Sequence, residues 1–406
     1  MSSAPFSEIP GGITAPSGFV AGSVYCGIKA GNKKRHDIAA IFSKEQATVG
    51  AATFTTNKVK AAPVRVSAAH VKTPRIRAII ANAGNANACT GLAGIQHAKC
   101  MAAATARALG VKERQVLVCS TGRIGVELPI KKMETAIGKL PKALHPGGSL
   151  QAAKAIMTSD TFAKEIAVEL KIHGHKVRIG GIAKGAGMID PNMATMLCFI
   201  TTDAAIGKKD LQDALSCAVE QSFNRITVDG DMSTNDTVIA LASGAAGNRP
   251  FKPKQPGFDA FQNALNHVTR QLARMIVEDG EGVTKFVEVH VQGAATYHDA
   301  RKAAEAVAKS TLVKCAWYGG DPNWGRIMDA LGYCSVKFRE EMVDIFYDGL
   351  IAVKNGMASK TPFSKLKQVA AKPKFTITID LRLGSSEYIV YTTDLSTRYV
   401  ELNMGE

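Results

Sequence analysis

Long hydrophobic runs are missing from this 406-residue sequence: none approaches the roughly 20 apolar residues that a membrane-spanning helix needs. The first residues, MSSAPFSEIPGG, lack the basic segment and apolar core of a secretory signal. The 8 cysteines form no Cys-x-x-Cys pair, and most lie in apolar stretches such as residues 116–119. We therefore expect reduced thiols in the core, no membrane partner and a cytoplasmic location.

Aromatic residues are scarce, at 6%, while the net charge is +15. A basic chain can bind nucleic acid, or it can present a solvated surface that attracts anionic substrates. Nucleic-acid binding predicts a basic patch interleaved with aromatics, but here the lysines and arginines are spread along the chain. The densest basic cluster, residues 33–36, is short and contains no aromatic residue. We favour the solvated surface and expect no nucleic-acid partner.

Several signatures of nucleotide, serine-hydrolase and zinc sites are absent. No Gly-x-x-x-x-Gly-Lys-Ser/Thr loop, Gly-x-Ser-x-Gly elbow or His-Glu-x-x-His helix occurs. Gly185 and Gly187 lead into Met-Ile-Asp-Pro rather than into a helix, which excludes a dinucleotide-binding turn. The one close histidine pair, His173 and His175, has no cysteine or carboxylate close by. It predicts a surface loop rather than a metal site.

Strand-like and helix-like segments alternate along the chain, which predicts an α/β or α+β architecture with substantial sheet. The length exceeds that of a usual single core, so we expect two domains or one large interleaved unit. The expected strands are residues 77–81, 115–119, 165–170, 176–182, 196–202 and 283–291. The expected helices are residues 93–109, 211–222, 258–278 and 299–308, the last with Asp299 as N-cap. Residues 374–381 and 387–392 predict a closing hairpin.

Glycine and small polar residues gather where these strands end. Such loops let backbone N–H groups approach a ligand closely. The stretches are residues 82–91, 120–125, 184–195, 229–236, 279–285 and 319–326. Any one of them alone is most simply an ordinary loop between a strand and the next element.

Taken together, these stretches resemble the ornithine acetyltransferases, also called glutamate N-acetyltransferases, of arginine biosynthesis. The decisive segment is residues 184–197, KGAGMIDPNMATML. The supporting segments are residues 54–64, 85–91, 119–122, 156–161, 224–231, 233–236, 279–285 and 321–326. Because the resemblance runs from Gly11 nearly to the C-terminus in ordered blocks, it is highly specific.

The resemblance implies a layered α-β-β-α sandwich and a chain that cuts itself between Ala194 and Thr195. The products would be an N-terminal chain, residues 1–194, and a C-terminal chain, residues 195–406, which stay together and pair again into a heterotetramer. Thr195 would be the nucleophile, with its freed α-amine as the base. Such an amine has a pKa near 7.7–8.0 in model peptides, which suits general base catalysis at neutral pH. From composition alone, Thr195 would only be the start of a strand.

Further site residues follow from the same resemblance. Thr121 and Gly122 match the positions of an oxyanion hole, which stabilises the charged oxygen of a tetrahedral intermediate. The substrate-binding positions that match are Thr158, Lys184, Thr195 itself, Glu281 and Asn403. Without the resemblance, each of these residues would be read as part of a turn or of the solvated surface.

The implied reaction is a double displacement that moves acetyl from N-acetylornithine to glutamate through an acetyl-Thr195 intermediate. It requires no metal and no cofactor. Acetyl-CoA as a second donor would make the enzyme bifunctional, and the residues leave this open. A related self-processing aminopeptidase, in which water resolves the acyl-enzyme, is the nearest alternative, and a basic binding protein is a more distant one.

Two departures from the family pattern are visible. The family continues past the position of Asn403 to a tail that ends in Ser or Thr, whereas this sequence stops three residues after Asn403. A family member with weakened substrate binding is therefore a further alternative. Asp190 stands where the family commonly has a small apolar residue, which places a carboxylate next to the expected cleavage loop.

Overall fold

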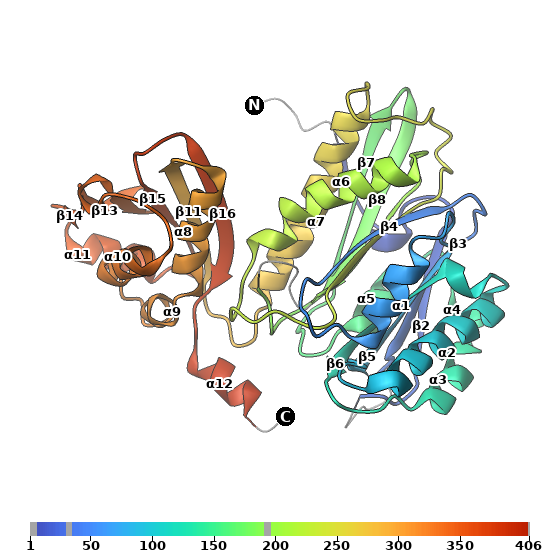
Figure 1. Cartoon of the computed structure of the whole chain (residues 1–406). Helices are drawn as coiled ribbons and strands as arrows, with labels where there is room; N and C mark the ends of the chain where they lie inside the picture. Colours follow the sequence, from blue (N-terminus) through green and yellow to red (C-terminus); the bar gives the residue numbers. More distant parts are fainter. Residues whose placement is uncertain (1–5, 30–34, 191–195, 405–406) are drawn as a thin grey trace. The chain divides into compact units, whose positions relative to one another are not determined.

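The computed structural model describes residues 6–29, 35–190 and 196–404. The described residues form two compact units (Figure 1). The first unit draws on Met1–Gly185, Asn192–Asn224 and Met232–Ile276, and the second on Ala186–Pro191, Arg225–Asp231 and Val277–Glu406. The boundaries of these two units differ from the expected cleavage point between residues 194 and 195. Strands that precede and strands that follow this point belong to the first unit.

Two β-sheets form the centre of the first unit. One sheet has the order β1 (Phe6–Ile9), β7 (Lys164–Ile172), β8 (His175–Lys184), β9 (Leu197–Thr202), β10 (Thr237–Ala242) and β4 (Val49–Phe54). The other has the order β2 (Phe19–Val24), β3 (Ile38–Ser43), β5 (Ala78–Asn85) and β6 (Val116–Arg123). Apolar side chains of both sheets, such as Phe199 and Leu117, share one buried cluster. Burial of these facing surfaces from water is the main force that holds the two sheets together.

Helices cover the outer faces of this sandwich. Those packed outside the four-stranded sheet are α1 (Ala62–His70), α2 (Gly91–Leu109), α3 (Ile130–Ile137) and α4 (Leu140–Ala143). Those on the side of the six-stranded sheet are α6 (Lys208–Glu220) and α7 (Phe258–Glu278) (Figure 1). One further helix, α5 (Ser149–Ile156), contributes to the buried cluster between the sheets. The expected α-β-β-α sandwich is confirmed.

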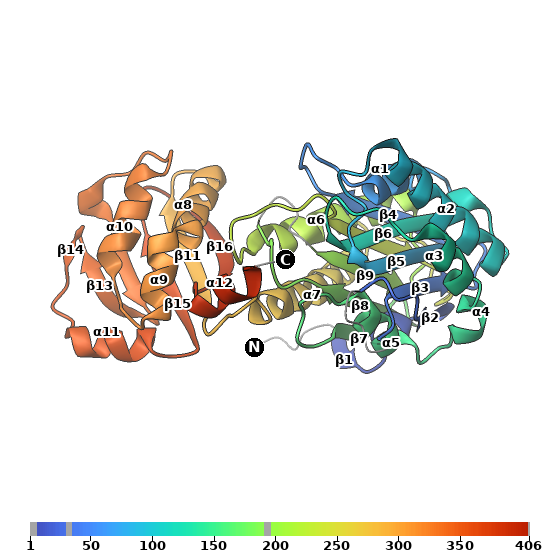
Figure 2. The same ribbon diagram turned by 90° about the horizontal axis from the view of Figure 1, so that it is seen from below.

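The second unit has one six-stranded sheet with its own core. Its strands, in order, are β14 (Met357–Ala358), β13 (Leu350–Lys354), β12 (Asp344–Tyr347), β15 (Lys374–Asp380), β11 (Phe286–Ala294) and β16 (Ser386–Thr393). Its helices are α8 (Tyr297–Lys309), α9 (Thr311–Tyr318), α10 (Trp324–Tyr333), α11 (Phe363–Ala370) and α12 (Thr397–Asn403). Figures 1 and 2 both place α8 beside β11 and β16, and Ala300, Ala303, Ala304 and Ala308 of α8 are buried in the core of this unit.

Most expected elements are present, but two details of the second unit are wrong. The expected closing hairpin does not form: β15 and β16 are not neighbours, because β11 lies between them, parallel to β15 and antiparallel to β16. The N-cap of α8 is Thr296, whose side chain accepts a hydrogen bond from the Asp299 N–H, so Asp299 lies in the first turn instead.

The cysteines differ from the expectation as well. All eight are free thiols, but only Cys119 and Cys198 are buried, and Cys89, Cys217 and Cys315 are exposed. Apolar neighbours in the sequence were a poor guide to cysteine burial, because one face of a surface helix or strand remains open to water.

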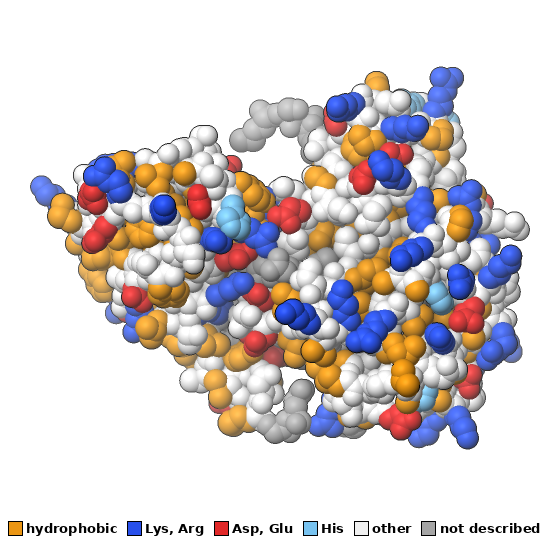
Figure 3. Space-filling view, viewed as in Figure 1, with side chains coloured by type: hydrophobic (Ala, Val, Ile, Leu, Met, Phe, Trp, Pro, Cys, Tyr) orange, Lys and Arg blue, Asp and Glu red, His pale blue; other side chains and the backbone are white. Residues whose placement is uncertain are grey.

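Lys and Arg side chains are scattered over the face shown in Figure 3, with Asp and Glu among them. Across the described part of the chain, no helix has the length and apolar character to cross a membrane.

Candidate active site

The ends of three neighbouring strands bring site candidates together in the first unit. Lys184, the last residue of β8, pairs in register with Leu197, the first residue of β9. Leu197 pairs in turn with Thr237, the first residue of β10. Immediately before these strands, the Met196 N–H donates to Asp236 Oδ1 at 3.0 Å. Lys184 therefore lies at the same edge of the sheet as the residue that follows Thr195 in the chain.

Asn235 links this edge to the other sheet. Its side-chain amide donates to the carbonyl of Ala86 at 2.6 Å and to the carbonyl of Ser120 at 2.9 Å. Ala86 follows β5 and Ser120 lies near the end of β6, so one buried side chain joins the ends of both sheets. Thr121 and Gly122, the expected oxyanion hole, follow Ser120 directly.

Gly122 occupies a position that only glycine fits. Its φ is +130°, and a Cβ there would lie 2.3 Å from the backbone carbon of Gly84 on the neighbouring strand. Any side chain would push β5 and β6 apart or strain the backbone. Thr121 is 3% exposed. The strand ending is therefore rigid, as a set of fixed hydrogen-bond donors requires.

Lys184 and Thr158 contact each other directly. The Lys184 ammonium donates to Thr158 Oγ1 at 2.6 Å. Behind them, Asp160 accepts a hydrogen bond from the Thr158 N–H at 3.0 Å, and its carboxylate lies 3.7 Å from the ammonium of Lys184. Burial alone would raise the pKa of Asp160, but the ammonium groups of Lys184 and Lys164 hold it well below its usual range. The carboxylate is thus ionised and the cluster is charged.

A cavity of about 670 Å³ lies next to this turn. Met157 and Thr161, on either side of the turn, both line it, together with Arg35 and Lys154. Among the described residues that line it, none is acidic. The volume falls in the range that holds small molecules, and the basic lining favours an anionic ligand.

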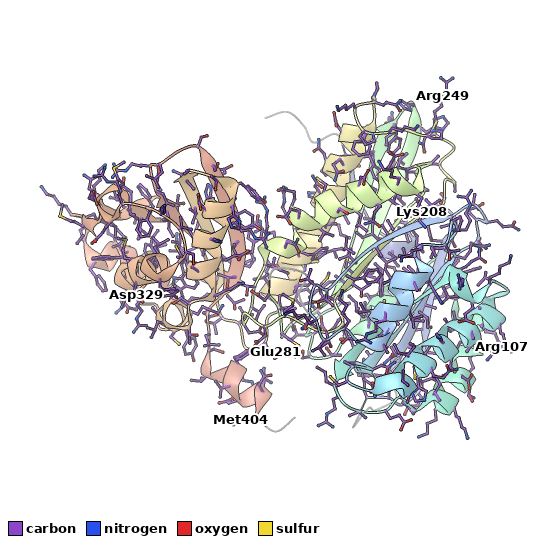
Figure 4. The ribbon with its side chains drawn as sticks, viewed as in Figure 1. Arg107, Lys208, Arg249, Glu281, Asp329 and Met404 are labelled. Atoms are coloured by element: carbon purple, nitrogen blue, oxygen red, sulfur yellow. The ribbon has the colours of Figure 1, made fainter. Side chains whose placement is uncertain are left out.

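In the second unit, Glu281 and Asn403 contact each other. The Asn403 side-chain amide donates to Glu281 Oε2 at 3.0 Å. Glu281, labelled in Figure 4, follows α7. Its own N–H donates to the Ala186 carbonyl at 2.9 Å. A Cβ at Gly187 would lie 2.6 Å from the Glu281 carboxylate, so the glycine allows this close approach. Two expected substrate-binding residues far apart in sequence are therefore neighbours.

Asp229 fixes the segment that leads towards the expected cut. Its two carboxylate oxygens accept hydrogen bonds from the N–H groups of Met188 at 2.6 Å and Ile189 at 2.8 Å. The Tyr399 hydroxyl donates to Asp229 Oδ2 at 3.2 Å. Burial, with the Asp229 charge beside it, raises the pKa of Tyr399 well above its ordinary value, so the hydroxyl keeps its proton and donates.

Asp190 is held by an ion pair. Lys309 on α8 lies 2.8 Å from its Oδ1 and 2.9 Å from its Oδ2, and Thr227 Oγ1 lies 3.1 Å from Oδ1. Burial raises the pKa of Asp190 to about 6, although Lys309 opposes this. The residue that departs from the family pattern is thus anchored to a helix of the second unit.

The raised pKa of Asp190 predicts a pH-dependent stability. Because the folded pKa exceeds the unfolded value, its contribution is fully present below about pH 4 and is lost as pH rises through about 6. Between pH 4 and 7 the contribution should fall by no more than about 3 kcal/mol. Asp190→Ala should therefore weaken the decline in unfolding free energy over this range, measured by urea unfolding. Asp213→Ala, which changes an exposed helix residue, is the control; equal pH profiles for all three proteins would contradict the assignment.

The structure brings Thr158 and Lys184 into contact in the first unit, and Glu281 and Asn403 into contact in the second. Thr121 and Gly122 also lie in the first unit, where Asn235 holds the neighbouring Ser120. Ala194 and Thr195 lie outside the described residues. Sequence reasoning missed four polar residues of these groups: Asp160, Asn235 and Asp236, which are buried, and Asp229, which is half-buried. All four lie in segments that carry the family resemblance, but no local pattern indicates that their side chains are hydrogen-bonded within the fold.

Comparison with known proteins places this chain among close relatives. The model of the ArgJ family matches residues 20–405. The chain is 45% identical over 395 residues to the arginine biosynthesis bifunctional protein ArgJ of Symbiobacterium thermophilum, covering 97% of this chain and 98% of the relative. It is 47% identical over 407 residues to the glutamate N-acetyltransferase of Methanocaldococcus jannaschii, covering 97% and 98% of the two chains. The solved structure of arginine biosynthesis bifunctional protein argJ from Bacillus halodurans is 38% identical, covers 51% of this chain and 97% of its own, and has a TM-score of 0.49.

Proposed function

The chain belongs to the ArgJ family and is an acetyltransferase of arginine biosynthesis, and we propose that it moves acetyl from N-acetylornithine to glutamate through acetyl-Thr195. The observation that carries this proposal is the part-buried hydrogen bond from the Lys184 ammonium to Thr158 Oγ1. It places an ammonium and a hydroxyl at the sheet edge where β9 begins, one residue after Met196. A substrate carboxylate is the natural ligand of such a pair.

Self-cleavage comes first in the proposed sequence. The Thr195 hydroxyl attacks the Ala194 carbonyl carbon, the Ala194–Thr195 C–N bond breaks, and an ester joins the two residues. Water then hydrolyses the ester, which leaves a carboxylate on Ala194 and a free hydroxyl and α-amine on Thr195. The hydroxyl and the base that activates it now belong to one residue, so little orientation has to be imposed.

Acetyl transfer then takes two steps. The Thr195 hydroxyl, losing its proton to its own α-amine, attacks the acetyl carbonyl of N-acetylornithine. The amide C–N bond breaks, and ornithine leaves with the proton on its amine. Glutamate's α-amine attacks the acetyl ester, N-acetylglutamate forms, and the proton returns to the Thr195 oxygen. In both steps Thr121 and Gly122 would stabilise the negative oxygen.

The two groups of site residues have separate tasks in this scheme. Lys184 and Thr158 hold the substrate α-carboxylate, which is common to N-acetylornithine and glutamate. Glu281, supported by Asn403, pairs with the side-chain ammonium of ornithine. We further propose that the two fragments remain associated as a heterotetramer in the cytoplasm. Acetyl-CoA as a second acetyl donor would make the enzyme bifunctional, and an assay with acetyl-CoA and glutamate alone tests for this activity.

The proposal predicts a covalent intermediate. Incubation with N-acetylornithine alone should add one acetyl group to the fragment that begins at Thr195, as seen by mass spectrometry of the separated fragments. Glutamate should remove this group and yield N-acetylglutamate. Initial rates at several fixed glutamate concentrations should give parallel double-reciprocal lines, because each substrate reacts with a different form of the enzyme.

Two results would speak against the transferase. Intersecting lines would indicate a ternary complex instead of an acetyl-enzyme. Rapid loss of the acetyl group to water in the absence of glutamate would indicate a self-processing hydrolase. Glycine in place of glutamate serves as the control acceptor, since it has the reacting amine without the side chain.

A further inference from the structure

Asp160 lies at the centre of a buried group of charges that also contains Lys164 and Lys184, and the proposed reaction gives no role to Asp160 or Lys164. The side chains of Asp160 and Lys164 are fully buried, and that of Lys184 is 3% exposed. Burying three charged groups costs a large amount of free energy unless they are paired. Their retention beside a proposed substrate-binding pair therefore calls for an explanation.

Each oxygen of the Asp160 carboxylate serves two neighbours. Oδ1 accepts hydrogen bonds from the Lys164 ammonium and from the Gly185 N–H, both at 2.7 Å. Oδ2 accepts one from the Thr158 N–H and faces the Lys184 ammonium at 3.7 Å. One carboxylate thus fixes the backbone beside Thr158 and the backbone directly after Lys184.

This arrangement also orients the hydroxyl of Thr158. The Lys184 ammonium has no lone pair, so in their 2.6 Å hydrogen bond it must be the donor and Thr158 Oγ1 the acceptor. The hydrogen of the Thr158 hydroxyl is then left to donate to another acceptor. A carboxylate bound here would receive one hydrogen bond from Lys184 and one from Thr158.

The two ammonium groups that face the Asp160 carboxylate, on Lys164 and Lys184, differ in their surroundings. Lys164 lies on the buried side, against Asp160 and above the ring of Phe162 at 4.8 Å. Lys184 is the ammonium that contacts Thr158.

We propose that Asp160 is a positioning residue that aims Lys184 and Thr158 at the α-carboxylate of both substrates, while Lys164 offsets its charge. The inference rests on the proposed function, because it assumes that these two residues bind substrate. The competing explanation is purely structural: Asp160 would be needed only to neutralise the buried Lys164.

Two variants separate these explanations. Asp160→Asn removes the charge and replaces one acceptor oxygen by a donor, which opposes the N–H of Thr158 or Gly185. The double variant Asp160→Asn/Lys164→Met also removes the buried cation, so it restores the charge balance and should fold. Asp203→Asn is the matched control, since Asp203 is another buried carboxylate of the first unit that accepts two backbone N–H bonds, from Arg178 and Ser17.

The experiment measures kcat and KM for N-acetylornithine and glutamate, with a denaturing gel to check self-cleavage. Asp160→Asn and the double variant should both raise KM for both substrates about 10- to 100-fold, with kcat changed only a few-fold and normal cleavage. Asp203→Asn should keep the wild-type KM. A double variant with wild-type KM would overturn the inference, because the carboxylate would then serve only Lys164. Failure of the proposed function would look different: the wild-type enzyme itself would not turn over these substrates.

Discussion

Thr195→Ala should stay a single chain of full length and should lose acetyl transfer completely. Without the hydroxyl, nothing attacks the Ala194 carbonyl, and neither the nucleophile nor its free α-amine is produced. Wild-type protein should give two fragments on a denaturing gel, the second of which begins at Thr195 by N-terminal sequencing. The loss of activity should reach the detection limit, because cleavage and acetyl transfer depend on the same oxygen.

The matched control is Thr195→Ser, which keeps the hydroxyl and loses one methyl group. It should still cleave and still form an acetyl-enzyme, although at altered rates. An uncut wild-type chain with full activity would refute the mechanism, as would normal acetyl transfer by Thr195→Ala.

Thr121→Val should reduce kcat by about 100- to 1,000-fold, with KM little changed. The substitution preserves shape and removes a hydroxyl that would donate to the developing oxyanion, and loss of one such donor typically costs about 2.7–4 kcal/mol of activation free energy. The effect belongs in kcat because the charge exists only in the transition state. The measurement is steady-state kinetics on fully processed protein.

Thr135→Val, on the exposed surface of α3, is the control for the same change of side chain. Gly122→Ala is less informative, since its Cβ would collide with Gly84 and the variant would lose stability as well as activity. If Thr121→Val raised KM and left kcat unchanged, the hydroxyl would bind the ground state, and another donor would have to serve the oxyanion.

Local patterns were enough for much of the fold. Residues 258–278 were expected as an amphipathic helix and form α7 with the same bounds, because their apolar positions recur at helical spacing. The His173-Gly174 turn between β7 and β8 was also expected, and both residues have positive φ there. In each case the deciding signal lies within a few neighbouring residues.

The order of the strands within a sheet could not be predicted from such local patterns. β15 and β16 follow each other in sequence with a glycine-bearing turn between them, which is the usual sign of a hairpin. The position between them is taken by β11, about 80 residues earlier in the chain (Phe286–Ala294). Pairing of this kind is decided by long-range burial, so no local signal records it.

The buried polar residues of the site could not be predicted from the sequence for a related reason. Asp160 and Asp236 are short acidic residues in polar loops, where solvated aspartates are common. What distinguishes them is the set of partners that the fold supplies, such as Lys164 and the Met196 N–H. Burial without such partners would be costly, but the sequence alone does not show which loops meet.

The position of β9 in its sheet limits how the two fragments can be made. β9 and β10, which follow the expected cut, lie between β8 and β4, which precede it. An N-terminal fragment made alone would therefore leave β8 and β4 each with an unpaired edge, and such edges recruit other chains into aggregates. The C-terminal fragment alone would carry two apolar strands without the sheet that they complete. Synthesis as one chain, cut only after β9 and β10 have paired with their neighbours, keeps those edges covered from the start.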